Sequence, residues 1–320
     1  MPLLNKNRIA YLGALTLLFS YAEMFLPRFI PFFRLGLSNI IILLALGMDF
    51  PSFIILTIIK ALAASVTNGT LLSPFFLISV AQSFASGLVM FVLFKIKKNW
   101  LGLYGISIAG GAVSSFVQIG MSALYLGSGT LTLIGPMLLF SMIASIITAT
   151  GATFLNIPKD TPNLPAEVET SPKHHNLSIL FIILILAAAI AILSIKNLII
   201  LTVALIAAFT TQLICGRKIK ILPHISIWLF VIISTILSPS GKIWFKIGNL
   251  AITQGAFFTG VEKALKLSAV AALSQCATKI KINSSSLLSM TLKYFSFLQK
   301  QFKTSDGNLF KKIKATLQLN

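Results

Sequence analysis

Long apolar runs without charges alternate with short polar breaks along most of the chain. Runs of about 18–20 residues are long enough to cross the hydrocarbon core of a bilayer. The first half holds such runs at about 9–27, 35–48, 51–67, 74–94, 101–126 and 130–155, and the second half at about 177–193, 197–215, 222–238 and 250–276. We therefore predict an all-α, polytopic helical membrane protein with about ten transmembrane helices, six followed by four.

The longest polar break divides the chain into units. Residues 157–176 carry closely spaced prolines, which exclude a helix of useful length and predict a Pro-rich cytoplasmic linker. The linker separates a six-helix membrane domain at 1–156 from a second membrane domain at 177–276. Residues 277–320 place apolar side chains at every third or fourth position among lysines, which predicts a basic amphipathic cytoplasmic tail. Such a helix either lies on anionic lipid or docks in the groove of a partner.

Composition and charge support a membrane protein. The 320 residues include 26 Lys and Arg but only 7 Asp and Glu, and 56% are hydrophobic. The basic residues form short clusters between apolar runs, as cytoplasmic loops do, so we expect lipid rather than nucleic acid as the surroundings. An N-terminus on the inside places most of them in the cytoplasm. The predicted location is the cell (inner) membrane, multi-pass, with both termini cytoplasmic.

Few residues could carry catalytic chemistry. The seven acids form no paired motif for a magnesium-bound diphosphate, and no Gly-rich loop ends in Lys-Ser or Lys-Thr. Cys215 and Cys276 are too few for a disulfide framework or a multi-cysteine zinc site. We expect no catalytic residue, metal or cofactor. His224 begins a predicted helix, where a structural or interfacial role is more usual than a ligand.

Polar residues inside apolar runs require an explanation, because an unsatisfied polar group in hydrocarbon costs several kcal/mol. Such residues either join helices through hydrogen bonds or line a polar cavity. Arg34 follows a proline-rich connection and could attract an anionic ligand or extend to headgroups. Glu23 is one of the polar residues inside the apolar runs, and the predicted substrate-binding set is Arg34, Asn39, Lys60, Asn68, Gln82 and Gln118.

Three stretches of the first half resemble a known family. They are FSYAEMFLPRFIPFFRLGLSNIIILLAL, LTIIKALAASVTNGTLLSPFFLISVAQSFASGLVM and YGISIAGGAVSSFVQIGMSALYLGS. Residues 9–155 resemble heptaprenyl diphosphate synthase component I, also called the Gx transporter family. The resemblance implies a six-helix substrate-binding (S) component of an energy-coupling factor transporter. It also implies that the small residues Ala10, Gly13 and Ala14 pack against the transmembrane (T) component.

The stretch SPSGKIWFKIGNLAITQGAFFTGVEKALKLSAVAALSQ, at 238–275, is similar to the T component of the same transporters. This resemblance implies cytoplasmic ABC-type ATPase subunits as partners. The implied coupling residues are Lys263, Lys266, Gln275, Leu288, Leu292 and Phe295. The Ala-Arg motif that is usual there is replaced by Ala264-Leu265-Lys266.

Three functions remain open at this point. The first is a non-catalytic, fused S–T importer component that binds a small molecule, vitamin-like or an isoprenoid or quinone precursor, and is driven by partner ATPases. The alternative is a non-catalytic membrane subunit (component I) of a polyprenyl (heptaprenyl) diphosphate synthase. The third is a carrier that works without ATPases.

Overall fold

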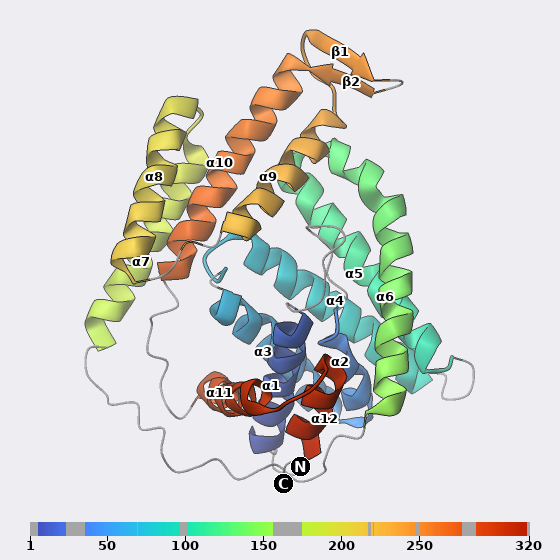
Figure 1. The fold of residues 1–320 in the computed structure, drawn as a ribbon. Helices are drawn as coiled ribbons and strands as arrows, with labels where there is room; N and C mark the ends of the chain where they lie inside the picture. Colours follow the sequence, from blue (N-terminus) through green and yellow to red (C-terminus); the bar gives the residue numbers. More distant parts are fainter. Residues whose placement is uncertain are drawn as a thin grey trace.

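A computed structural model describes residues 6–23, 36–68, 70–96, 101–155, 175–216, 219, 221–247, 250–276 and 286–318. The N-terminal part is helical (Figure 1). Its elements are α1 (Lys6–Glu23), α2 (Asn39–Leu44), η1 (Ala45–Gly47), α3 (Phe50–Asn68), α4 (Pro74–Ile96), α5 (Leu103–Leu126), η2 (Ser128–Leu133) and α6 (Ile134–Phe154). Helices α4, α5 and α6 pack side by side in chain order, and α3 joins them to α1.

Three helical segments in the described part of the chain are long and apolar enough to cross a membrane. They are Pro74–Ile96, Leu103–Leu126 and Ser128–Phe154. Shorter apolar helices cover Phe50–Ser65, Ile183–Ser194, Leu198–Ile214 and Ile221–Ile236. The structure is therefore that of a helical, membrane-associated protein, and the count of ten spanning helices stays a prediction.

The prediction of one spanning helix over 35–48 is wrong for the part that the structure describes. Helix α2 has 6 residues and continues only as the 3-residue η1. Together they rise about 15 Å, half of the hydrocarbon thickness. Gly36, with a φ of +70°, turns the chain before α2, and Asp49 starts the next helix just after η1.

The C-terminal part is built around one central helix. Its elements are α7 (His175–Ser194), α8 (Leu198–Ile214), α9 (Ile221–Ile236), β1 (Ile243–Ile247), β2 (Leu250–Thr253) and α10 (Gln254–Cys276). Helix α10 packs against α7, α8 and α9. The antiparallel hairpin β1–β2 pairs Ile247 with Leu250 and connects α9 to α10. This hairpin was not predicted from the sequence, although Ile243, Phe245 and Ile247 alternate as strand residues do.

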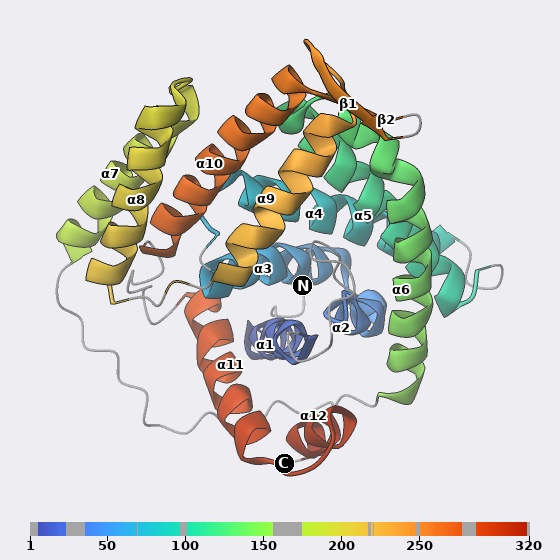
Figure 2. The same cartoon turned by 45° about the horizontal axis from the view of Figure 1, so that its top comes forward.

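The tail forms two helices, α11 (Leu287–Thr304) and α12 (Leu309–Gln318), in agreement with the predicted amphipathic pattern. The most buried side of α11 packs within the chain itself. Figure 2 shows α1 between α11 and α2, and α11 also contacts α3. Every residue of α1 from Ile9 to Phe19 is buried. Both interpretations of the tail that the sequence left open therefore missed its contact with the chain's own first helix.

The N- and C-terminal parts also meet at a second place, away from the tail. The Lys263 ammonium on α10 donates a hydrogen bond to the Leu126 carbonyl at 2.7 Å, and Leu126, Val231, Ala264 and Leu267 form one buried cluster. A Cβ added to Gly129 would lie 2.5 Å from the Ser234 carbonyl oxygen, so η2 and α9 approach closely there. Among the described residues, the two parts thus meet at α5–η2, at the tail, which packs on α1 and α3, and at Leu72, whose backbone N–H donates to Ser274 Oγ at 2.9 Å.

Candidate functional site

A group of polar side chains lies inside the N-terminal part, where α1, α2 and α3 meet. The Lys60 ammonium on α3 donates a hydrogen bond to the Asn39 side-chain oxygen at the start of α2. Both residues are half-buried. The amide oxygen thus satisfies a cation that apolar helices surround.

Glu23 completes this group from the end of α1. Its side chain is 8% exposed, and its Oε1 accepts a hydrogen bond from the Gly36 backbone N–H at 3.1 Å. The Lys60 charge is coupled electrostatically to the Glu23 carboxylate. We call Glu23, Gly36, Asn39 and Lys60 the polar cluster. It offers a cation, a carboxylate and an amide in a largely apolar interior, where each charge acts more strongly than in water.

Of the predicted substrate-binding residues that the structure describes, hydrogen bonds join only Asn39 and Lys60. Gln82 on α4 is half-buried, and its buried Oε1 has no hydrogen-bond partner within the described part of the chain. Gln118 on α5 is half-buried as well. Helix α3 ends at Asn68, whose side chain is outside the described residues, as is Arg34.

Glu23 was predicted as a polar residue within an apolar run but not as a substrate-binding residue, and Gly36 was not predicted at all. A carboxylate at the end of an otherwise apolar helix was the available signal for Glu23. Nothing in the sequence indicated Gly36, because this residue contributes its backbone N–H and not a side chain, and the N–H reaches Glu23 only through the local turn. Its φ of +70° is a conformation that glycine adopts without strain.

The small residues Ala10, Gly13 and Ala14 of α1 lie where this helix packs against the tail helix α11. Ala10 and Ala14 are fully buried. A Cβ added to Gly13 would lie 3.0 Å from Thr291 Cγ2 on α11 and 3.1 Å from Ile59 Cγ2 on α3. Glycine thus lets three helices approach closely at this point.

Aromatic rings extend the contact between α1 and α11 in both directions. Tyr11 meets Tyr294 edge to face at 5.7 Å between ring centroids, and Tyr21 meets Phe302 at 6.0 Å and Phe295 at 6.4 Å. Edge-to-face pairs have a preferred geometry and add stabilisation beyond that of the buried area, so they favour one relative position of the two helices.

The predicted coupling residues fall into two separate groups. Leu288, Leu292 and Phe295 lie half-buried on α11, where the most buried side is formed instead by Thr291, Tyr294, Leu298 and Phe302. The buried side of α11 is therefore rotated slightly around the helix axis from the predicted coupling side, which Leu288, Leu292 and Phe295 form.

The other predicted coupling residues lie on α10 and are engaged within the chain. Lys266 donates to Glu262 at 2.6 Å, and Gln275 accepts a hydrogen bond from Gln212 at 2.9 Å. Lys263 bonds to Leu126, as described above. Because α10 packs on α7–α9 and α11 on α1 and α3, the structure does not bring these residues together with those of α11.

Fold and polar cluster together define a helical membrane protein whose C-terminal tail packs on its N-terminal part. Residues 12–155 match the family described as heptaprenyl diphosphate synthase component I, which confirms the resemblance predicted for this part of the chain. Residues 177–294 match a family described as a domain of unknown function (DUF8519), so the likeness to a T component stays a prediction. No curated protein and no solved structure matches the chain.

Proposed function

We propose that this chain is a non-catalytic membrane transporter component of the fused S–T type. Its N-terminal part would bind a small molecule, vitamin-like or an isoprenoid or quinone precursor, and separate cytoplasmic ABC-type ATPases would drive the import. One observation carries the proposal: the tail that follows the C-terminal membrane domain packs along α1 of the N-terminal one, at Gly13. A movement of the C-terminal part would therefore reach the N-terminal part directly.

The contacts of α1 give this movement a route to the polar cluster. Tyr21 contacts α11, and Glu23 follows it by two residues at the end of the same helix. Helix α11 also touches α3, which carries Lys60. A shift of α11 would change the positions of Glu23 and Lys60 relative to Asn39, and with them the affinity for a ligand held there.

The chemistry of the polar cluster suits a mainly apolar ligand with a small polar end. Lys60 can attract an anionic or carbonyl oxygen, Asn39 can donate or accept hydrogen bonds, and the surrounding helices are apolar.

The family description favours a second candidate, an accessory membrane subunit of a polyprenyl (heptaprenyl) diphosphate synthase. In that function the N-terminal part would hold a prenyl chain near a separate catalytic subunit. No ATPase would be needed.

One experiment separates the two candidates. The tagged full-length chain is purified in mild detergent from its own cells, the proteins that accompany it are identified by mass spectrometry, and its bound small molecule is identified by native mass spectrometry. ABC-type ATPase subunits in near-stoichiometric amounts would support the transporter. A prenyl synthase catalytic subunit without ATPases would instead support the accessory role and refute the coupling mechanism.

A further inference from the structure

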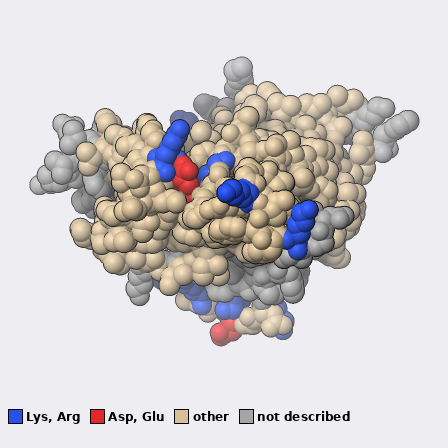
Figure 3. Space-filling model, turned by 90° about the horizontal axis from the view of Figure 1, so that it is seen from above, with Lys and Arg blue, Asp and Glu red and all other residues tan. Residues whose placement is uncertain are grey.

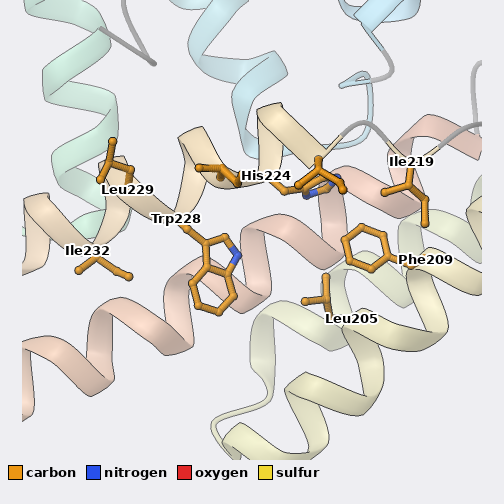
Figure 4. A pocket seen from close by; sticks show the side chains of 9 residues that line it. Leu205, Phe209, Ile219, His224, Trp228, Leu229 and Ile232 are labelled. Atoms are coloured by element: carbon orange, nitrogen blue, oxygen red, sulfur yellow. The ribbon is translucent and has the colours of Figure 1, made fainter.

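A cavity of about 530 Å³ lies in the C-terminal part, between α8 and α9. Leu205 and Phe209 line it from α8, and His224, Trp228 and Ile232 line it from α9 (Figure 4). This volume is within the range of small-molecule sites. The cavity is separate from the polar cluster and belongs to the part that matches a domain of unknown function.

One polar side chain in the cavity lacks a partner. His224 is 7% exposed, and neither of its ring nitrogens has a hydrogen-bond partner among the residues that the structure describes. Its ring packs edge to face on Phe209 at 4.9 Å between centroids, which supplies no hydrogen bond. Leaving such a group unsatisfied in an apolar site is unfavourable, so its position indicates a missing polar partner.

The other polar side chain in the cavity, the indole of Trp228, already has a hydrogen-bond partner. Trp228 Nε1 donates to Ser268 Oγ on α10 at 3.0 Å, which fixes the ring as a wall of the cavity. Among the nine described residues that line the cavity, His224 is therefore the one whose side chain has unused hydrogen-bonding atoms. None of the nine is an aspartate, glutamate, lysine or arginine.

The cavity opens onto an apolar surface. Ile221, Ile225 and Leu229 line it and are still 67%, 55% and 42% exposed. In a helix that lies in a membrane, such residues face lipid, so an occupant can enter sideways from the bilayer.

We propose that this cavity binds a membrane-soluble amphiphile with a hydrocarbon chain and one hydroxyl group. The chain lies along the leucine, isoleucine and aromatic walls, and the hydroxyl group forms a hydrogen bond with His224. A hydroxyl fits because it donates and accepts, as a neutral imidazole does. A charged headgroup does not fit, because the described lining offers it no opposite charge.

Fluorescence of Trp228 tests the proposal. The full chain with Trp100→Phe and Trp244→Phe keeps Trp228 as its single tryptophan, since the sequence has 3. In non-brominated lipid vesicles it is titrated with 11-bromoundecanol and, separately, with 1-bromoundecane, both expressed as mole fraction in the bilayer. We expect saturable quenching by the alcohol, with half-quenching at a mole fraction about tenfold lower than for the alkane.

Two variants and one competitor separate the site from general lipid contact. His224→Phe should raise the half-quenching mole fraction of the alcohol about tenfold and leave that of the alkane unchanged. Leu205→Phe should remove the saturable quenching by filling the cavity. Undecanol, but not undecane, should restore the fluorescence of the chain that keeps His224.

A matched control retains Trp244 instead, through Trp100→Phe and Trp228→Phe. Trp244 lies on the hairpin and is 48% exposed, so its quenching should rise without saturation. Equal half-quenching by alcohol and alkane would mean that the cavity holds ordinary acyl chains, and the proposal would be wrong. Quenching of Trp228 that never saturates would also overturn it, because it would show only general contact of the indole with lipid.

Discussion

Lys60 sits among apolar helices because Asn39 and Glu23 provide the polar environment that it needs. The Lys60→Met change removes the hydrogen-bond donor of the Asn39 oxygen and the positive charge near the Glu23 carboxylate, which keeps its bond from the Gly36 N–H. We expect the free energy of unfolding in detergent to fall by about 1–3 kcal/mol.

Thermal unfolding measured beside a control variant checks this prediction. Lys196 is exposed in the connection between α7 and α8, so Lys196→Met should change the unfolding temperature little. Adding Glu23→Gln to Lys60→Met should recover part of the loss. If both single lysine variants behaved alike, the polar cluster would have no structural role.

Asp49 is the residue at which stability should depend on acid pH. Hydrogen bonds from the Ser52 hydroxyl at 2.9 Å and the Ser52 N–H at 3.2 Å lower the pKa of the Asp49 carboxyl below its ordinary value. The ionised form is therefore favoured in the folded protein. Its contribution is present above the unfolded pKa of about 4 and is lost as the pH falls through the lower, folded pKa.

The Asp49→Asn variant should match the natural chain in stability near neutral pH, because an amide oxygen can still cap α3. Below about pH 4 the natural chain should lose stability more steeply than this variant. Unfolding midpoints measured across that range decide the matter. Parallel curves for the two chains would contradict the assigned hydrogen bonds.

At the scale of elements, the contact of α1 with α11 depends on the size of residue 13. Gly13→Ala places a Cβ 3.0 Å from Thr291 Cγ2, closer than such atoms normally approach. We expect a loss of about 1–3 kcal/mol in the free energy of unfolding. We also expect faster tryptic cleavage within the tail.

A second change tests whether Thr291 is the obstacle. Thr291→Ser removes Cγ2 and should restore part of the stability and protease resistance of Gly13→Ala. The control is Gly120→Ala on α5, where an added Cβ meets nothing within 4 Å. A Gly13→Ala chain as resistant as the control would place the tail elsewhere.

Much of the helical architecture could be predicted, because apolar runs and the polar breaks between them mark helix ends. The run at 51–67 is the helix Phe50–Asn68, and the run at 74–94 is Pro74–Ile96. The prediction of a spanning helix over 35–48 was wrong. Apolar character alone does not reveal that the chain turns at Gly36 and that the α-helix after it has only six residues.

The sequence identified the unusual polar residues but not their pairing. Asn39 and Lys60 are 21 positions apart, and only the packing of α2 on its neighbours brings them together. The amphipathic pattern of α11 likewise showed that one side needed a cover. It could not show that α1 provides it, because periodicity carries no information on the partner.

At the scale of the whole molecule, the hairpin and the tail lie at opposite ends (Figure 1). The face seen from above, where the hairpin lies, is largely uncharged with scattered basic side chains (Figure 3). Trp244 and Phe258 are 48% and 44% exposed there and meet at 6.1 Å between ring centroids. Exposed aromatic residues of this kind are typical of the boundary between membrane and water.

This arrangement predicts which side of the membrane each end faces. The basic tail should be cytoplasmic and the hairpin outside, because lysine-rich segments are retained on the inner side. The test uses the full chain with Cys215→Ser and Cys276→Ala, to which either Lys246→Cys in β1 or Lys303→Cys in α11 is added; both lysines are exposed. A membrane-impermeant maleimide should label the Lys246→Cys variant in intact cells and the Lys303→Cys variant only after permeabilisation. The chain without cysteine gives the background. The reverse labelling pattern would invert the topology, and a tail outside the cell could not be moved by cytoplasmic ATPases.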